Sequence, residues 1–297
     1  EINNKTGGAL IYDKLVTNDV KHAFLFSGGS VMPIIDQFYD GPIKYYINTH
    51  EQNCGHAATG YAKSTGTTGV CLVTSGPGIT NMITPMLDAT NDSTPLVVIS
   101  GQVPLSVSGS NAFQEAPAVE LSKCVTKWSY QIQDVREIDI IIDTAFKVAN
   151  NGKKGAVHID VPKCISSQRI DTDNFFHKNK NKNKNIIQIN SLLPKLDEPE
   201  LPEDLYIQEI ASVINKSQKP IIYLGQGCIE AYQKLRNFID IAKIPVTSTI
   251  HGLGIHNDHN DLSLRWCGMH GYAPANFALQ KADTIIAIGS RFDDRTT

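Results

Sequence analysis

Residues 70–81, VCLVTSGPGITN, decide the fold of the first half of the chain. The apolar run at their start predicts a strand buried on both faces, and the two glycines predict a tight turn that opens a helix. Such a turn can bind an anion or a heterocycle at free backbone N–H groups. A plain turn between strand and helix explains the same residues equally well. The stretch matches neither the P-loop nor the G-x-G-x-x-G fingerprint of dinucleotide-binding proteins.

The sequence up to residue 165 repeats this alternation of apolar runs and helical patterns. Apolar runs predict strands at residues 23–26, 44–47, 70–73, 96–99 and 156–161. Amphipathic or small-residue stretches predict helices at residues 8–20, 31–39, 51–65, 79–91 and 138–150. Continuous apolar strands separated by helices are typical of a parallel sheet covered on both faces. We therefore predict one three-layer α/β domain over residues 1–165.

A second domain of the same class is predicted after a break in this pattern. We place a linker at residues 166–203, with a low-complexity Lys/Asn run at 178–185 that has no apolar period to fold with. The α/β rhythm resumes at residue 204. Its strands are expected at 220–225, 245–248 and 284–289, and its helices at 205–215, 231–242 and 273–281. Since the sequence stops directly after a strand, we expect this Rossmann-like domain (204–297) to be incomplete and the polypeptide to be longer.

Composition excludes several classes of protein. The 297 residues are 41% hydrophobic and 19% charged, with a net charge of −3, so neither nucleic acid nor a membrane surface is an expected partner. The lysines at 178–185 have no interleaved aromatic residue, which favours a solvated linker over a nucleic-acid patch. The six cysteines form no C-x-x-C pair, which fits a reducing compartment. No signal peptide, transit peptide or transmembrane run is present, so we expect a cytoplasmic protein by default.

One carboxylate stands out in NTHEQNCGHAATGYAKSTG, residues 48–66. Glu51 precedes small and apolar residues, and the simple interpretation is capping support. Asn48 and Thr49 can cap a helix, whose dipole favours an acid in its first turn. The small residues that follow predict a helix buried against a neighbour, where a carboxylate needs a partner or a function. Both interpretations remain open on these residues alone.

Two further motifs are weaker. HEQNCGH, residues 50–56, does not favour zinc, because its histidines are six positions apart and fall on different faces of a helix. His56 is expected to pack or to lie on the helix surface. LGQGCIE, residues 224–230, lacks the third glycine of a dinucleotide-binding fingerprint, so a cofactor turn and a plain turn both remain open.

Read together, these stretches resemble the catalytic subunit of the acetohydroxyacid synthases (acetolactate synthases), a family of thiamine-diphosphate enzymes. The resemblance runs from about residue 6 to 297, apart from the Lys/Asn run. It rests on motifs that occur in the family's order: HEQ (50–52), TSGPGITN (74–81), GQVP (101–104), AFQE (112–115), TKW (126–128), DVPK (160–163), GMHG (268–271) and RFDDR (291–295).

The resemblance implies a domain plan and its cofactors. Residues 1–165 would bind the pyrimidine of thiamine diphosphate, and residues 204–297 would be an FAD-type central domain. A C-terminal domain, absent from this sequence, would hold the diphosphate through Mg²⁺ at a Gly-Asp-Gly…Asn motif. No metal ligand is therefore expected in this chain, which alone is expected to be inactive.

Individual residues take roles from the same resemblance. Glu51 matches the glutamate that hydrogen-bonds the aminopyrimidine and favours the imino tautomer, which removes the thiazolium proton. Gln114 matches an amide beside the reacting carbons. Phe113 and Lys163 match substrate-channel positions. The other positions that match the thiamine-diphosphate pocket are Gly28, Gly29, Pro77 and Asn81.

FAD contacts are matched in the second domain, where the cofactor would be largely structural because the net reaction involves no redox change. The matching positions are Gly225, Gly227, Thr249, Gly268, Met269, His270, Gly289, Arg291, Asp293 and Arg295. Three places depart from the family. FSGG at 26–29 replaces an aromatic-Pro-Gly-Gly turn, lysines at 153–154 replace an arginine that contacts FAD, and His251 replaces a methionine that faces the flavin. Lysine lacks the bidentate fork of arginine.

The implied activity is acetolactate synthesis. Two pyruvate molecules, or pyruvate and 2-ketobutyrate, would condense with decarboxylation to 2-acetolactate or 2-aceto-2-hydroxybutyrate, the first common step of branched-chain amino acid biosynthesis. The implied small-molecule partners are 2-ketoacids. The implied assembly is a homodimer or homotetramer, to which a regulatory small subunit can bind. Two alternatives remain. One is a non-catalytic truncated paralogue with a binding or assembly role; the other is a different thiamine-diphosphate decarboxylase or lyase of the same fold.

Overall fold

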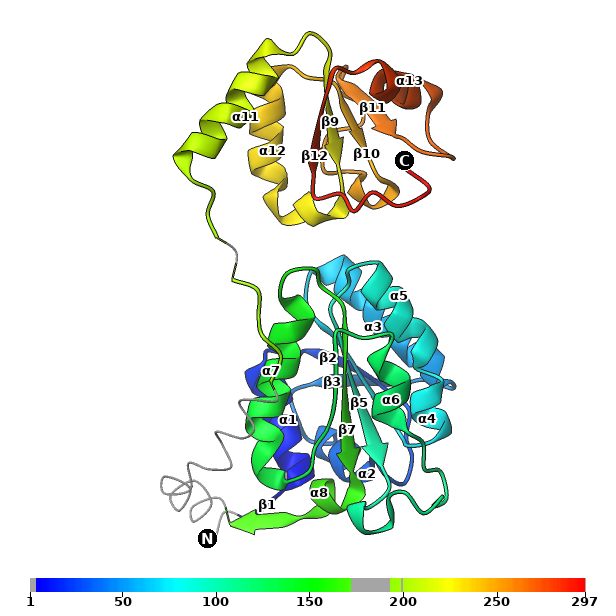
Figure 1. Ribbon diagram of the computed structural model, residues 1–297. Helices are drawn as coiled ribbons and strands as arrows, with labels where there is room; N and C mark the ends of the chain where they lie inside the picture. Colours follow the sequence, from blue (N-terminus) through cyan, green and yellow to red (C-terminus); the bar gives the residue numbers. More distant parts are fainter. Residues whose placement is uncertain (1–3, 172–192, 199, 297) are drawn as a thin grey trace. The chain divides into compact units, whose positions relative to one another are not determined.

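The computed structural model describes residues 4–171, 193–198 and 200–296, in two compact units, Glu1–Pro199 and Glu200–Thr297 (Figure 1). The predicted Lys/Asn run at 178–185 lies outside the described residues. Within the described part of the chain, every helix is too short or too polar to cross a bilayer.

Unit 1 is built on a six-stranded sheet in the order β3-β2-β4-β5-β7-β6, with every neighbouring pair parallel. Its strands are β2 (His22–Leu25), β3 (Lys44–Ile47), β4 (Gly69–Val73), β5 (Leu96–Gln102), β6 (Trp128–Gln131) and β7 (Ala156–Pro162). This confirms the predicted fold class and each strand expected in this half. β6 is an addition: its sequence, WSYQ, has no continuous apolar run, and its residues are only half-buried at the sheet edge.

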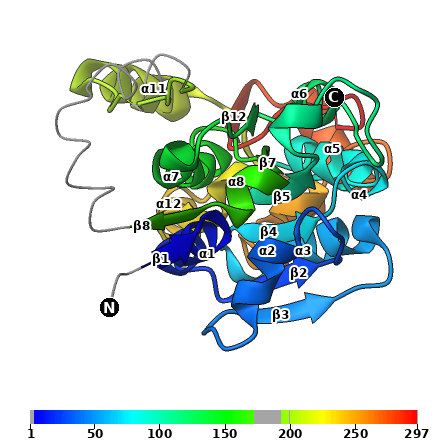
Figure 2. The same cartoon turned by 90° about the horizontal axis from the view of Figure 1, so that it is seen from below.

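Helices cover both faces of this sheet, as Figures 1 and 2 show. They are α1 (Gly7–Thr17), α2 (Met32–Ile35), α3 (Glu51–Thr65), α4 (Pro77–Thr80), α5 (Ile83–Asn91), α6 (Ala118–Lys123), α7 (Ile138–Asn150) and α8 (Lys163–Ser167), with 3₁₀ turns η1 (Asp36–Phe38), η2 (Leu105–Val107) and η3 (Val135–Glu137). Alternate residues of β4 enter opposite layers. Leu72 packs in the core cluster that contains residues of α1 and α7, and Val73 packs in the cluster that contains residues of α3 and α5.

Unit 1 continues beyond residue 165, where we expect the first domain to end. β8 (Arg169–Asp171) returns to pair antiparallel with β1 (Asn4–Thr6), and Leu193 packs against the larger core cluster. Three-residue strands of this kind carry too little pattern to be predicted from sequence. Their pairing nevertheless joins residues 169–171 to the first unit.

Several expected helices differ in detail from the structure. The helix expected at 8–20 ends at Thr17, and the one expected at 31–39 is α2 followed by the 3₁₀ turn η1. The helix expected at 79–91 is interrupted: Asn81 caps the end of α4, and α5 starts at Ile83. α3 has the expected bounds, yet it is not buried all round. Cys54 and Ala58 are fully buried, while His56, Gly60 and Lys63 on the opposite side are exposed. The helix is thus buried against its neighbours as expected, on the one face that packs on β4 and α5.

Unit 2 is a four-stranded parallel sheet in the order β11-β10-β9-β12. Its elements are α11 (Asp204–Lys216), β9 (Pro220–Leu224), η5 (Gln226–Ala231), α12 (Tyr232–Ala242), β10 (Val246–Ser248), η6 (Ile250–Gly252), β11 (Ser263–Trp266), α13 (Ala273–Lys281) and β12 (Thr284–Ile288). Ile239 of α12 packs on one face, in the cluster of Ile222 and Val246, and Ala275 of α13 packs near Tyr223 on the other. The strands and helices expected here are all present, and β11 is an addition.

Candidate active site

The carboxyl edge of the unit 1 sheet gathers polar side chains from the turns after β2 and β4. The Ser30 and Thr74 hydroxyls lie 2.9 Å apart, and the Ser75 N–H donates to Ser30 Oγ at 3.0 Å. Gly28 packs so closely that a Cβ there would lie 2.3 Å from Thr74 Cβ. Ser30, which is buried, therefore joins the two turns. Sequence reasoning missed this residue, although its place after the glycines of FSGGS was a signal.

Glu51 opens α3 at the same edge, directly after β3. The N-cap is His50, not Asn48 or Thr49: its Nδ1 accepts from the Gln52 N–H at 3.1 Å. Glu51 is only 7% exposed. The N-terminal turn of a helix favours its negative charge, which offsets part of the cost of this burial. A partner satisfies one of its oxygens, since Asn81 Nδ2 donates to Glu51 Oε2 at 2.9 Å. The buried carboxylate thus has the partner that its burial requires.

The break between α4 and α5 makes this pairing possible. Asn81 leaves the helical run as the C-cap of α4, so its amide belongs to the end of a short turn instead of the middle of a helix. Glu51 Oε1 faces the backbone of the same turn, where a Cβ on Gly78 would lie 3.8 Å from it. Among the described residues, no donor to Oε1 is present. A ligand with a ring N–H could therefore be bound at this oxygen.

Gly76 fixes the shape of the turn between β4 and α4. Its backbone has φ 59° and ψ −117°, a conformation that favours glycine. A Cβ there would lie 2.8 Å from the carbonyl oxygen of Gln114. The turn therefore brings the loop that contains Gln114 to the edge where Glu51 and Asn81 lie, although the three residues are far apart in sequence.

The loop before α6 carries the predicted substrate residues. Gln114 itself has φ +59°, and Phe113 is 89% exposed. Glu115 holds the loop through its own backbone: its carboxylate accepts from the Gly109 N–H and, at 3.0 Å, from the Ala112 N–H. These hydrogen bonds from Gly109 and Ala112 lower the pKa of Glu115 below its ordinary value. Glu115 was part of the AFQE motif but was not among the predicted site residues.

Most of the residues predicted for one site thus lie together. Gly28, Glu51, Pro77, Asn81 and Gln114 all belong to turns at the carboxyl edge of the unit 1 sheet, where ligands of parallel sheets usually bind.

Gly29, Lys163 and His56 complete the predicted positions in this unit. Lys163 starts α8 after β7, at the same edge, and its side chain is exposed. Gly29 is exposed, and a Cβ there would meet nothing within 4 Å, so packing does not explain this glycine. His56 is a surface residue 3.7 Å from the Asp88 carboxylate. Within the described part of the chain, no cluster of His, Cys, Asp or Glu is arranged to hold a metal ion.

In unit 2, the residues predicted for FAD also follow the carboxyl ends of strands. Gly225, Thr249, Gly268 and Gly289 come directly or two residues after β9, β10, β11 and β12. Backbone approach already explains two of these glycines, because a Cβ on Gly225 would lie 2.2 Å from the Gly289 carbonyl oxygen.

The remaining predicted positions of unit 2 form a second group at this edge. The Met269 N–H donates to the Arg295 carbonyl oxygen at 2.8 Å, and a Cβ on Gly268 would lie 2.3 Å from that oxygen. Asp293 Oδ1 accepts from the Arg295 N–H at 3.0 Å, and its other oxygen lies 3.5 Å from Arg291. Gly227 packs on Gly289, and the His270 carbonyl accepts from Trp266.

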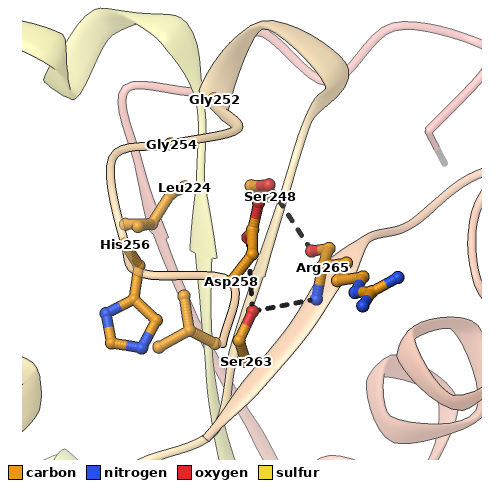
Figure 3. Close-up of a pocket in the computed structure, with 9 residues that line it drawn as sticks. Leu224, Ser248, Gly252, Gly254, His256, Asp258, Ser263 and Arg265 are labelled. Atoms are coloured by element: carbon orange, nitrogen blue, oxygen red, sulfur yellow. Dashed lines mark hydrogen bonds between the residues drawn. The ribbon is translucent and has the colours of Figure 1, made fainter. Parts of the chain in front are cut away.

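A small cavity lies beneath η6 in unit 2, next to these turns (Figure 3). Its volume is about 10 Å³, enough for about one water molecule. His256 lines it and is buried, with neither ring nitrogen hydrogen-bonded, and burial lowers the pKa of His256. None of the residues predicted to hold FAD lines the cavity. The other residues around it are Leu224, Val246, Ser248, Gly252, Gly254, Asp258, Ser263 and Arg265.

Comparison with known protein families assigns both units to one class. The model described as the N-terminal TPP binding domain of thiamine pyrophosphate enzymes matches residues 5–121, and the model of their central domain matches residues 207–297. The chain belongs to the thiamine pyrophosphate enzymes. The first match covers the turns that contain Glu51, Asn81 and Gln114.

Within this class, the chain is similar to acetolactate synthases. It is 41% identical over 305 residues to the mitochondrial acetolactate synthase of Schizosaccharomyces pombe, which covers 99% of the chain and 44% of that protein. It is 39% identical over 306 residues to the mitochondrial acetolactate synthase catalytic subunit of Aspergillus candidus, covering 99% of the chain and 42% of that protein. The large subunit from Cyanidium caldarium is 37% identical over 299 residues, with 99% of the chain and 50% of that protein covered. The chain thus spans about half the length of these relatives.

Proposed function

We propose that the chain is part of the catalytic subunit of an acetolactate synthase. The reaction would condense two pyruvate molecules, or pyruvate and 2-ketobutyrate, with loss of carbon dioxide, to 2-acetolactate or 2-aceto-2-hydroxybutyrate. The observation that carries the proposal is the buried Glu51 carboxylate, held by Asn81 at the mouth of α3. The acetolactate synthases to which the chain is similar along almost its whole length support the choice of reaction within the class.

The residues at this edge suit the aminopyrimidine of thiamine diphosphate. Glu51 Oε1 is turned toward the Gly78 backbone and can accept a hydrogen bond from a ring nitrogen, while Asn81 keeps Oε2 occupied. The open space at Gly29 leaves room for a flat ring near the backbone. When bound, thiamine diphosphate supplies a carbon nucleophile and an electron sink for decarboxylation.

Glu51 would act by sharing a proton with the bound ring. A carboxylate that is shielded from water and fixed by one amide cannot turn away from its ligand, so its second oxygen stays aimed at one position. Asn81 is in this interpretation the positioning residue for Glu51. Its N–H donates to the ionised acid without competing for the proton, because an amide N–H does not titrate.

Gln114 and Phe113 would face the 2-ketoacid. The amide of Gln114 can donate to a substrate oxygen, and the exposed ring of Phe113 can cover an apolar group. Lys163, exposed at the start of α8, would attract the substrate carboxylate to the same sheet edge.

We further propose that the enzyme binds FAD through unit 2 and Mg²⁺ with the diphosphate. For FAD, the supporting observation is position: the predicted residues of unit 2 follow the ends of its four strands, although the contact between Gly225 and Gly289 gives these glycines another reason. A flavin absorption spectrum of the purified protein tests this part. The Mg²⁺ site that binds the diphosphate would lie outside the residues of this chain.

We also propose that the enzyme works as a homodimer or larger assembly. Strand β3 supports this, because it is an edge strand whose Tyr45, Tyr46 and Ile47 are 40%, 45% and 67% exposed, an unusual edge for a protein that stays alone. Sedimentation of the complete protein at micromolar concentration should give a dimer or larger species. Active monomers under these conditions would contradict the proposal.

The decisive experiment is an acetolactate assay on the protein encoded by the complete reading frame, supplied with pyruvate, thiamine diphosphate and Mg²⁺. We expect acetolactate to form, with carbon dioxide released in equal amount. Binding of thiamine diphosphate without acetolactate formation would instead favour a non-catalytic paralogue or a different decarboxylase of the class.

A further inference from the structure

A buried polar network lies between strands β5, β6 and β7, next to the candidate active site. Asp160 is at its centre and is fully buried. Its Oδ1 accepts from Ser100 Oγ at 2.6 Å, and its Oδ2 accepts from Gln102 Nε2 at 3.0 Å and from Gln131 Nε2 at 2.9 Å. A carboxylate buried this deeply is tolerated only with such donors.

A second arm of the network reaches α6 through His158. Ser100 has one proton, which it donates to Asp160, so its oxygen accepts from His158 Nε2 at 2.8 Å. Nδ1 of the neutral ring lies 2.7 Å from Ser122 Oγ, whose single proton is also within reach of the Ala118 carbonyl oxygen at 2.8 Å. Burial lowers the pKa of His158 to about 3, in agreement with a neutral ring that donates at one nitrogen only. The arm thus connects Ser122 of α6 to Asp160 through His158 and Ser100.

The first arm leads from Asp160 to the Gln114 loop. The orientation of the Gln102 amide is fixed, since its Oε1 accepts from the Val103 N–H at 2.9 Å. Its Nε2 donates to Asp160 and also to the carbonyl oxygen of Ala116 at 3.0 Å. Ala116 is two residues after Gln114.

Both ends of one segment are therefore attached to the same carboxylate. The segment from Gln114 to Ser122 is held near its start by Gln102 and at its end, in α6, by His158 and Ser100. Neutralising a buried charge would require only that Asp160 be given donors, as Gln131 does. It would not require Gln102 to reach out of the network to the loop.

We propose that Asp160 and Gln102 are positioning residues for the reaction, which hold the backbone at Ala116 and thereby place Gln114 beside the thiamine site. This inference rests on the proposed function for its effect on turnover, but its structural part does not. Asp160 fixes the Gln102 amide, Gln102 fixes the Ala116 carbonyl, and Gln114 has only one residue between it and that fixed point. The contact of the Gln114 backbone with Gly76 then sets its distance from Glu51.

Two glutamines of the network provide a matched pair of variants. Gln102→Met and Gln131→Met each remove one donor to the same oxygen of Asp160 and keep the length of the side chain. Only Gln102→Met also removes the hydrogen bond to Ala116, together with the bond from the Val103 N–H that orients the amide. Any effect of disturbing Asp160 itself should be shared by the two variants, and any effect on the loop should be confined to the first.

The first measurement is amide hydrogen exchange in the complete protein. Gln102→Met should accelerate exchange at Ala112, Glu115 and Ala118, by roughly fivefold to tenfold for one lost hydrogen bond. Gln131→Met should leave these three amides at the wild-type rate. Unchanged exchange in Gln102→Met, or equal acceleration in both variants, would overturn the proposal. If Gln102→Met does not fold, Gln102→Asn keeps the amide but is too short to reach both partners, and the same outcomes apply.

The second measurement separates turnover from cofactor binding. In Gln102→Met, kcat should fall about 10- to 100-fold, as expected for a reacting group misplaced by about 1 Å. The Kd for thiamine diphosphate should stay unchanged, because Glu51 and Asn81 keep their hydrogen bond. A weaker Kd with unchanged kcat would contradict a positioning role for Gln102. A wild-type protein that makes no acetolactate would refute the proposed function, while the exchange measurement would still decide the role of Gln102.

Discussion

The two units have the same architecture, a parallel sheet with turns at its carboxyl edge. They differ in the contacts that join those turns, which are made by side chains in unit 1 and by backbone in unit 2. In unit 1 the turns are joined by buried side chains: Ser30 to Thr74 and Glu51 to Asn81. In unit 2 they are joined by backbone, with Gly225 against Gly289 and Gly268 against the Arg295 carbonyl. The side chains at that edge, such as Met269 and Arg295, are largely exposed.

The difference shows how each edge can serve a ligand. Buried, hydrogen-bonded side chains fix individual atoms, which suits proton transfer at one defined position. A backbone edge built of glycines offers N–H groups and a smooth surface, which suits the holding of an extended molecule. Substitutions at the carboxyl edge should therefore lower the reaction rate in unit 1 and the stability of the fold in unit 2.

The largest effect is expected at the unit 1 edge, for Glu51→Gln in the complete protein. The amide keeps the shape and the bond to Asn81 can be rearranged, but it cannot share a proton, so acetolactate formation should slow by about 10²- to 10⁴-fold. The matched control is Asp139→Asn, since Asp139 is also an acid in the first turn of a helix but is exposed. Initial rates with pyruvate measure both. Near-wild-type turnover in Glu51→Gln would remove this residue from the mechanism.

The backbone edge of unit 2 should respond to added volume. A Cβ on Gly225 would lie 2.2 Å from the Gly289 carbonyl oxygen, so Gly225→Ala should destabilise unit 2 by about 3 kcal/mol. Gly29→Ala in unit 1 has open space around it and should change stability by no more than about 0.5 kcal/mol. Denaturant unfolding followed by circular dichroism compares the two. Equal unfolding free energies of the two variants would show that the backbone at Gly289 moves away from the added Cβ at no cost.

Asp160 should make the stability of unit 1 depend on pH. Burial raises the pKa of Asp160 from 3.8 to about 6, against the hydrogen bonds from Ser100, Gln131 and Gln102, and Glu120 adds to the rise. The stabilising contribution of its protonated form is complete below about pH 4 and is lost as the pH rises through 6. Asp160→Asn should therefore be more stable than the wild type at pH 8, by about 2 kcal/mol, with the gap closing toward pH 4.

His158 acts in the opposite sense over the same range, because burial lowers its pKa from 6.5 to about 3 and stability is lost as the unfolded chain takes up a proton. Both proteins in the Asp160 comparison contain His158, so its effect cancels in their difference. Urea unfolding at several pH values measures that difference. A gap that is constant with pH would contradict the raised pKa of Asp160.

The smallest effect should come from the hydroxyl that joins the unit 1 turns. Ser30→Ala leaves the Ser75 N–H without its acceptor and should lower the unfolding free energy by about 1 kcal/mol. Ser27→Ala, at an exposed position of the same turn, is the control and should have almost no effect. Thermal unfolding of the two variants under identical conditions makes the comparison. An equal loss in both would mean that the bridge at Ser30 adds nothing.

Sequence alone was sufficient for elements with a continuous apolar or aromatic run, a helical period or clear boundary residues. The expected bounds of the strand at 44–47 and of the helices at 51–65, 138–150 and 273–281 coincide with β3, α3, α7 and α13. These elements have either a strong apolar period or clear boundary residues. The edge strands β6 and β11 were not expected, because half-buried edges have mixed composition. The stop between α4 and α5 was not expected either, since nothing in ITNMI breaks a helix.

The candidate site was predicted in part for a similar reason. Glu51 was visible as a lone acid among small residues, and its partner Asn81 lies in a quoted motif. Ser30, Gln102 and Asp160 were not singled out as site residues, because each reads as part of a turn or strand until the strands are placed side by side. The alternation of polar His158 and Asp160 within an otherwise apolar strand was the available signal for the buried network.

In the arm from Ser122 through His158 and Ser100 to Asp160, the two ring nitrogens of His158 can also exchange their donor and acceptor roles. If Asp160 takes up a proton at Oδ1, Ser100 must accept from it and donate to His158 Nε2, so the imidazole proton moves to Nδ1 and points at Ser122. No heavy atom has to move, and the ring stays neutral throughout. This change exchanges the two ring nitrogens between their pyridine-like and pyrrole-like forms. Nitrogen-15 chemical shifts of His158, followed from pH 8 to pH 4, should therefore exchange near pH 6 while the imidazole gains no charge.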